Sequence, residues 1–311
     1  MKTMQDQIIE DKFFKEIKIK NFSKENILFF SRELNKNGNT IVPNVLSEKE
    51  INKIKNLLIK KSKEKNTLRL ATPELEHRIF LELAVHPLFL RLWRECLGGA
   101  PILSHYDGNI IPPNSESILW WHTDHPTMLL DKYQENVVGQ TIIMLDDFTE
   151  DNGATKILPG SHKKGFSPNN SEKSIKEIET SATTICGKKG SISFTMGGTW
   201  HTAGINKTKN PRSSLVIMYV APHVVRNHDL TRAISQYKNL PLFVEEALGS
   251  SAWVSLPRIN SIDTKNIIFR IFGKLISIMP SNLVEYLNIQ ITLRRSQERR
   301  KKWGYEGKGS N

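Results

Sequence analysis

The first clear pattern along the chain is an extended apolar run followed by an amphipathic helix. Residues 39–43 read Asn-Thr-Ile-Val-Pro, which suits a short strand. Ser47 and Glu50 then form a capping-box pair, after which apolar residues recur at helical spacing at Ile51, Ile54, Leu57 and Leu58. We expect a strand, then a helix that ends near residue 65.

Helical and β patterns then divide the next part of the chain. A second helix is predicted over residues 79–97, because Gly98-Gly99 follows its apolar periodic residues. Short β-rich runs separated by turn residues come after it, at residues 101–111, 118–122, 140–145, 191–196, 200–204 and 213–220. Such runs are typical of an antiparallel sandwich or barrel.

Beyond residue 222 the pattern becomes helical again. Residues 266–279 carry apolar side chains at helical spacing, and residues 294–303 form a basic tail. We therefore expect a helical extension at 1–38, a mainly β domain at 39–222, and a C-terminal helical extension with a basic tail at 223–311. The C-terminal helix either packs on the β domain, which we favour, or makes peripheral contact with an anionic membrane surface.

Composition narrows the protein class. With 311 residues, 38% of them hydrophobic, the chain has enough apolar material for one large domain. It has only two cysteines, Cys96 and Cys186, which excludes a disulfide framework and a thiolate zinc site and favours a reducing cytoplasm. The first residues are charged, so we expect no secretory leader, and no run of apolar residues reaches the length of a membrane span.

The net charge of +12 raises the question of an anionic partner. Much of the excess is Lys scattered among Asp and Glu in the first 65 residues, a pattern of solvated helix faces. The chain also lacks a basic groove interleaved with aromatic residues. We expect no nucleic-acid partner.

A candidate metal site begins at Trp121-His122-Thr123-Asp124. His122 and Asp124 are two residues apart at the end of a predicted strand, so both side chains lie on one face. His201 supplies a third ligand from another strand, after a turn at Gly197-Gly198. Two His and one carboxylate leave three coordination positions open, which suits iron(II) that must bind both a co-substrate and dioxygen.

Arg212 follows His201 across a turn that lets the next strand run back beside it. Its planar guanidinium matches a carboxylate through two parallel hydrogen bonds. A dicarboxylate such as 2-oxoglutarate can chelate iron at its keto-acid end and reach Arg212 with the other. Ser214 lies on the same face of that strand and adds a hydroxyl to the same carboxylate.

These residues, with the stretch from Leu145 to His162 that contains Asp-Asp-Phe-Thr-Glu-Asp-Asn-Gly and Pro-Gly-Ser-His, resemble the phytanoyl-CoA dioxygenase family of iron(II)/2-oxoglutarate oxygenases. The resemblance covers about residues 39–222. It implies a double-stranded β-helix, a jelly-roll or cupin-like barrel with helices packed outside. It also implies iron ligands at His122, Asp124 and His201 and a carboxylate partner at Arg212.

The resemblance, with strand alternation, also places Asn109 and Gln140 where such enzymes hydrogen-bond the co-substrate. His162 we interpret as structural, closing a turn. The neighbouring Asp146 and Asp147 resemble a paired-carboxylate site, but the family pattern makes them a turn.

The function expected is hydroxylation of a small molecule by dioxygen, with 2-oxoglutarate converted to succinate and CO₂. Desaturation or cyclisation fit the same residues. The competing hypothesis is a non-catalytic binding protein of the same fold at a membrane surface. We expect the substrate to contact residues 127–139, residues 166–184 and the region near His228, and nothing in the sequence identifies it.

Overall fold

The computed structural model describes residues 13–18, 20, 22–115, 121–124, 136–168, 171, 175–224, 236–237 and 240–249. These residues belong to one compact unit that ends at Ser250. The helix predicted at 266–279, the basic tail, the region near His228 and most of the strand predicted at 118–122 lie outside the described residues.

Two capped helices flank the first strand. Helix α2 (Lys24–Asn37) begins after the N-cap Ser23 and ends at Gly38, whose φ of 82° is the left-handed conformation that glycine adopts easily. Helix α3 (Glu48–Glu64) begins with the predicted capping box, in which Ser47 and Glu50 satisfy each other's backbone N–H groups. Strand β1 (Asn39–Val42) lies between these helices, as predicted.

The single helix predicted over residues 79–97 is wrong. The structure has two helices there, α4 (Arg78–Ala84) and α5 (Pro87–Cys96). Pro87 disfavours helical backbone at the residue before it, and His86 is extended with a ψ of 128°. The His86 side chain then caps α5, its Nδ1 accepting a hydrogen bond from the Leu88 amide at 3.1 Å.

The larger sheet has six antiparallel strands in the order β1-β7-β4-β9-β3-β2. Strands β3 (Ile102–Ile111), β4 (Val138–Met144), β7 (Ile192–Met196) and β9 (Arg212–Val220) occupy predicted β runs to within two residues at each end. Strand β2 (Arg69–Ala71), which pairs with β3 at the sheet edge, is too short to leave a sequence pattern.

A smaller antiparallel sheet has the order β6-β5-β8, formed by β5 (Lys156–Ile157), β6 (Thr183–Thr184) and β8 (His201–Thr202). Strand β8 is shorter than the predicted 200–204. Short helices complete the described part: the 3-10 helices η1 (Pro73–Leu75) and η3 (Ser161–Lys164), and the α-helices α6 (Ile175–Thr180) and α8 (Leu242–Ala247).

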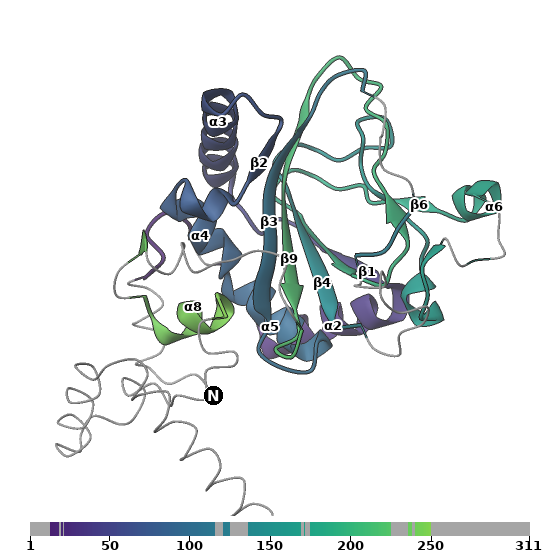
Figure 1. The fold of residues 1–311 in the computed structure, drawn as a ribbon, viewed down its shortest axis with the longest axis horizontal. Coiled ribbons are helices and arrows are strands. Elements are labelled where there is room, and N and C mark those ends of the chain that lie inside the picture. Colours follow the sequence, from purple (N-terminus) through teal and green to yellow (C-terminus); the bar gives the residue numbers. More distant parts are fainter. Residues whose placement is uncertain are drawn as a thin grey trace, which may run out of the picture. The chain divides into compact units, whose positions relative to one another are not determined.

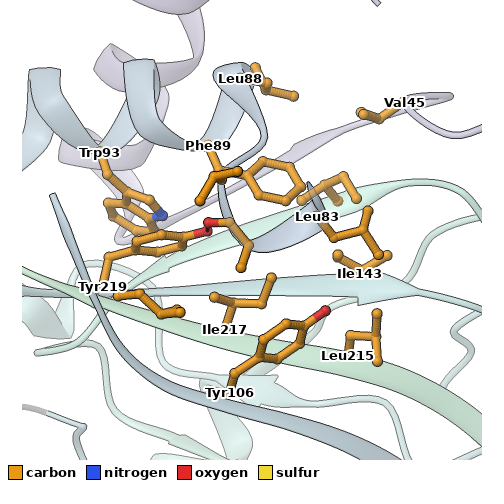
Figure 2. Packing of buried hydrophobic residues seen from close by; sticks show 14 of the residues in the cluster. Val45, Leu83, Leu88, Phe89, Trp93, Tyr106, Ile143, Leu215, Ile217 and Tyr219 are labelled. Atoms are coloured by element: carbon orange, nitrogen blue, oxygen red, sulfur yellow. Dashed lines mark hydrogen bonds between the residues drawn. The ribbon is translucent and has the colours of Figure 1, made fainter. Parts of the chain in front are cut away.

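Helices α3, α4 and α5 cover one face of the larger sheet, which we call the outer face (Figure 1). There Leu215, Ile217 and Tyr219 of β9 pack beneath Phe89 and Trp93 of α5 (Figure 2). Two buried polar groups in this layer are paired. The Trp93 indole donates to the Thr141 hydroxyl at 2.8 Å, and the Tyr219 hydroxyl donates to the Ala84 carbonyl at 2.7 Å.

The opposite, inner face of the larger sheet packs against the smaller sheet. Ile142 and Met144 of β4 and Val216 of β9 form a second apolar cluster with Ile157 of β5 and Ile185. Because side chains alternate along a strand, Gln140, Arg212 and Ser214 share this inner face. The expectation of a mainly β protein with helices outside is confirmed. Among the described residues, no helix combines the length and apolarity needed to cross a bilayer.

Candidate metal centre

Three predicted ligands meet at one point of the structure. A nitrogen of each His, from His122 and His201, and a carboxylate oxygen of Asp124 lie within 4.8 Å of one another. The His122 Nε2 is 3.8 Å from Asp124 Oδ1, and the His201 Nε2 is 3.6 Å from Asp124 Oδ2. Among the described residues this is the one group of three or more His, Cys, Asp or Glu side chains able to share a metal ion.

Backbone pairing brings these residues together. His122 and His201 form an isolated antiparallel bridge, with N–H to carbonyl distances of 2.9 and 3.0 Å in the two directions. The amide of Asp124 donates to the Gly197 carbonyl at 2.8 Å, within the predicted turn before β8. The bridge places both imidazoles on the same side.

The orientation of His201 fixes which nitrogen faces the metal. Its Nδ1 lies 2.8 Å from the Thr199 carbonyl oxygen, which can only accept a hydrogen bond. Nδ1 therefore carries the hydrogen, and Nε2 keeps a lone pair for a metal ion. Nothing in the sequence pattern identified Thr199 as the residue that orients this ligand.

Gln140 lies at the metal site. Its Nε2 donates to Asp124 Oδ2 at 2.6 Å, and its side chain is buried. The sequence predicted a contact with the co-substrate for this residue; the contact the structure has is with the carboxylate ligand.

Arg212 is a buried cation whose direct contacts among the described residues are neutral groups. Its guanidinium donates to the Ser214 hydroxyl at 2.9 Å and to the Gly153 carbonyl at 2.6 Å, and lies 4.2 Å from the centre of the Phe148 ring. Among the described residues no carboxylate lies within ion-pair distance of it. Burial lowers the pKa of Arg212 to about 10, against the opposing effect of the nearby Asp146.

Asn109 lies beside Arg212 and Ser214. It is directly opposite Ser214 in the β3–β9 ladder, and Arg212 lies two residues before Ser214 on β9. Asn109, Ser214 and Arg212 therefore form one polar group on the inner face.

A charged cluster lies next to this polar group on β3. The buried Asp107 carboxylate contacts His105 Nε2 at 2.5 Å and accepts a hydrogen bond from Arg69 Nε at 2.7 Å. Burial raises the pKa of Asp107, but these two partners outweigh it and hold the pKa below its usual range. His105 and Asp107 share a face with Asn109, because alternate residues of a strand point to the same side.

Other predicted roles are structural in the described residues. Asp146 Oδ2 accepts the Ser213 amide of β9 at 2.8 Å, and Asp147 accepts the Lys189 amide at 2.9 Å, so both carboxylates tie the bend after β4 to distant backbone. His162 Nε2 lies 2.9 Å from the Asn35 carbonyl and joins η3 to α2. Asn136, which the sequence did not single out, accepts the Gly198 amide at 3.2 Å and fixes the turn before His201.

Comparison with known proteins agrees with this arrangement. Residues 34–214, more than half of the chain, match the family model described as phytanoyl-CoA dioxygenase (PhyH). Dioxygenase af480 of Aspergillus fumigatus is 32% identical over 160 residues, which cover 49% of this chain and 48% of that protein. Dioxygenase FUM3 of Gibberella moniliformis is 31% identical over 117 residues, covering 36% of each. The chain thus spans at most about half the length of these relatives.

Solved structures share the fold at low identity. The epimerase SnoN from nogalamycin biosynthesis, in complex with Fe³⁺, α-ketoglutarate and nogalamycin RO, has a TM-score of 0.55 at 18% identity, covering 70% of this chain and 91% of that one. EctD from S. alaskensis with bound Fe has a TM-score of 0.55 at 16% identity, covering 67% and 82%.

Proposed function

Because the chain belongs to the phytanoyl-CoA dioxygenase family, we propose that it is an iron(II)- and 2-oxoglutarate-dependent oxygenase. The metal is held by His122, Asp124 and His201, and the distal carboxylate of 2-oxoglutarate by Arg212. The domain responsible spans residues 39–222 and is a double-stranded β-helix, with helical extensions before and after it. The organic substrate is a small molecule, and dioxygen is a further substrate. The enzyme works in the cytoplasm.

The observation that carries this proposal is the buried charge of Arg212. Among the described residues the buried guanidinium has no carboxylate within ion-pair distance, which is costly, and a dicarboxylate co-substrate supplies the missing partner. Ser214 and Asn109 lie beside it with polar groups for the same ligand. The donor set of two His and one carboxylate leaves positions for the keto-acid end and for dioxygen.

Iron with 2-oxoglutarate supplies the power to oxidise an unactivated C–H bond, with succinate and CO₂ as by-products. The protein's own residues bind and orient. Thr199 holds His201 with Nε2 toward the metal, and the Asp124 backbone is fixed to Gly197. Arg212 sets the direction in which 2-oxoglutarate lies. We propose hydroxylation as the outcome, with desaturation or cyclisation as alternatives on the same residues.

An anaerobic titration tests the proposal. Iron(II) and 2-oxoglutarate together should give a weak visible charge-transfer band, and admission of oxygen should then yield succinate. Glutarate, which lacks the keto group, is the matched control and should give no band. If 2-oxoglutarate gives no band while the protein binds zinc tetrahedrally, the oxygenase assignment is wrong.

A further inference from the structure

The hydrogen bond from Gln140 to Asp124 assigns a task to a residue outside the ligand set. The carboxylate of Asp124 only accepts hydrogen bonds, so the amide NH₂ of Gln140 must face Oδ2, and the 2.6 Å distance marks a charge-assisted bond. Gln140 is 8% exposed, which leaves little water to compete for its amide.

Strand register separates Gln140 from the residues around Arg212. In the β4–β9 ladder Gln140 lies opposite Met218, whereas Ser214 lies opposite Met144. Four residues along a strand correspond to about 13 Å. Gln140 therefore belongs to the metal end of the inner face, and Ser214 and Arg212 to the other end.

A carboxylate ligand that is free to rotate can bind a metal through one oxygen or both. Bidentate binding by Asp124 would take one of the three positions that the co-substrate and dioxygen need. A donor bound to Oδ2 occupies a lone pair of that oxygen and restricts rotation of the carboxylate. Strand β4 is a rigid base for this donor, because it pairs with β7 on one side and β9 on the other.

We propose that Gln140 is a positioning residue that holds Asp124 as a one-oxygen metal ligand, and that it does not anchor the co-substrate. This inference rests on the proposed metal site. On this proposal the affinity for the metal and its coordination number depend on Gln140 as well as on the three ligands.

Cobalt(II) is the probe, because its visible d–d spectrum reports coordination number without any turnover. Gln140→Met keeps the length and burial of the side chain but removes the donor. We expect the dissociation constant for cobalt(II) to rise about 10- to 100-fold, as it does when outer-shell partners of metal ligands are removed. The d–d spectrum should change as well. Gln140→Glu, which places an acceptor against Oδ2, should weaken cobalt binding at least as much.

Met218→Leu is the matched control, since Met218 is the neighbour of Gln140 on β9 and shares its face. It should bind cobalt(II) like the wild-type protein. Circular dichroism checks the fold of each variant. If the variants fail to fold, a zinc titration of the ¹⁵N-labelled wild-type protein still decides, because the side-chain amide signal of Gln140 should shift at one equivalent of zinc.

Three results overturn the inference: an unchanged cobalt affinity in Gln140→Met, an unshifted Gln140 amide signal, or a loss of 2-oxoglutarate affinity with cobalt affinity intact. The last result would make Gln140 a co-substrate ligand. The proposed function fails separately. If cobalt binding is tight and depends on Gln140 but iron and 2-oxoglutarate give no band, the positioning role of Gln140 is supported and the oxygenase assignment is wrong.

Discussion

The imidazole rings of His122 and His201 lie with their centres 4.2 Å apart and their planes inclined by 51°, although each comes from a different part of the chain. Their backbones form an antiparallel bridge in which each amide bonds to the other's carbonyl. Side chains of directly paired residues leave a sheet on the same side. The bridge thus places two imidazole ligands on one side, and Asp124 supplies a carboxylate.

Asp124→Ala should abolish tight iron(II) binding. The substitution removes the only anionic ligand of the triad, and two neutral imidazoles hold a divalent ion much more weakly. Anaerobic equilibrium dialysis with iron(II) measures the effect, and Asp151→Ala, at an exposed turn residue, is the control. Retention of wild-type affinity in Asp124→Ala would show that the ion binds elsewhere.

The cluster of His122, Asp124 and His201 could be predicted from the sequence because each residue lies in a local pattern, while the role of these residues as ligands stays a prediction. His122 and Asp124 are two residues apart, the Gly197-Gly198 turn precedes His201, and Arg212 follows a turn into a long strand. Strands β3, β4, β7 and β9 could be predicted for the same reason, since each is long enough to show its pattern. The closed double-stranded β-helix stays a prediction.

Features that depend on tertiary contacts had no such signal. Asn136 accepts the amide of Gly198 from a distant part of the chain, and Thr199 orients His201 through its backbone carbonyl, which a residue of any type can supply. The side chain of Gln140 was placed on the correct face by alternation, but its partner is set by where Asp124 lies. The break between α4 and α5 was missed although Pro87 marks it, because the apolar period continues across it.

Glu82→Gln should destabilise the fold strongly. The Glu82 carboxylate is fully buried and accepts the backbone amides of residues 15, 16 and 17 and the guanidinium of Arg78. An amide replaces one acceptor oxygen by a donor that faces other donors, so we expect a loss of about 2–4 kcal/mol in the free energy of unfolding. Urea denaturation measures it, with the exposed Glu95→Gln as control. A loss below about 1 kcal/mol would refute the anchoring role.

Glu74→Gln should change how stability depends on pH. Burial raises the pKa of Glu74 to about 7, Asp107 adds to the rise, and neither carboxylate oxygen has a partner among the described residues. A carboxyl whose pKa is raised on folding contributes stability that is complete below pH 4.5, its unperturbed pKa, and is lost as pH rises through 7. Glu74→Gln has no carboxyl at this position, so the variant cannot lose this stability as pH rises. Between pH 5 and 7.5 its free energy of unfolding should therefore gain on the wild type, by at most about 3 kcal/mol. Parallel urea-denaturation profiles at all pH values would contradict this.

Arg212→Lys tests the co-substrate site, because it keeps the positive charge and changes only its geometry. The guanidinium is held in place by Ser214, the Gly153 carbonyl and the Phe148 ring. A flexible ammonium cannot reproduce two parallel hydrogen bonds.

Each charge-assisted bond to a carboxylate is worth about 1.5–3 kcal/mol, so the 2-oxoglutarate concentration for half-maximal succinate formation should rise about 10- to 100-fold. Iron(II) affinity should stay at the wild-type value, since Arg212 is not a ligand. The exposed Arg94→Lys is the control and should alter neither quantity. An unchanged half-saturation value in Arg212→Lys would exclude Arg212 as the carboxylate anchor, whereas lost iron binding would show that the substitution damages the metal site itself.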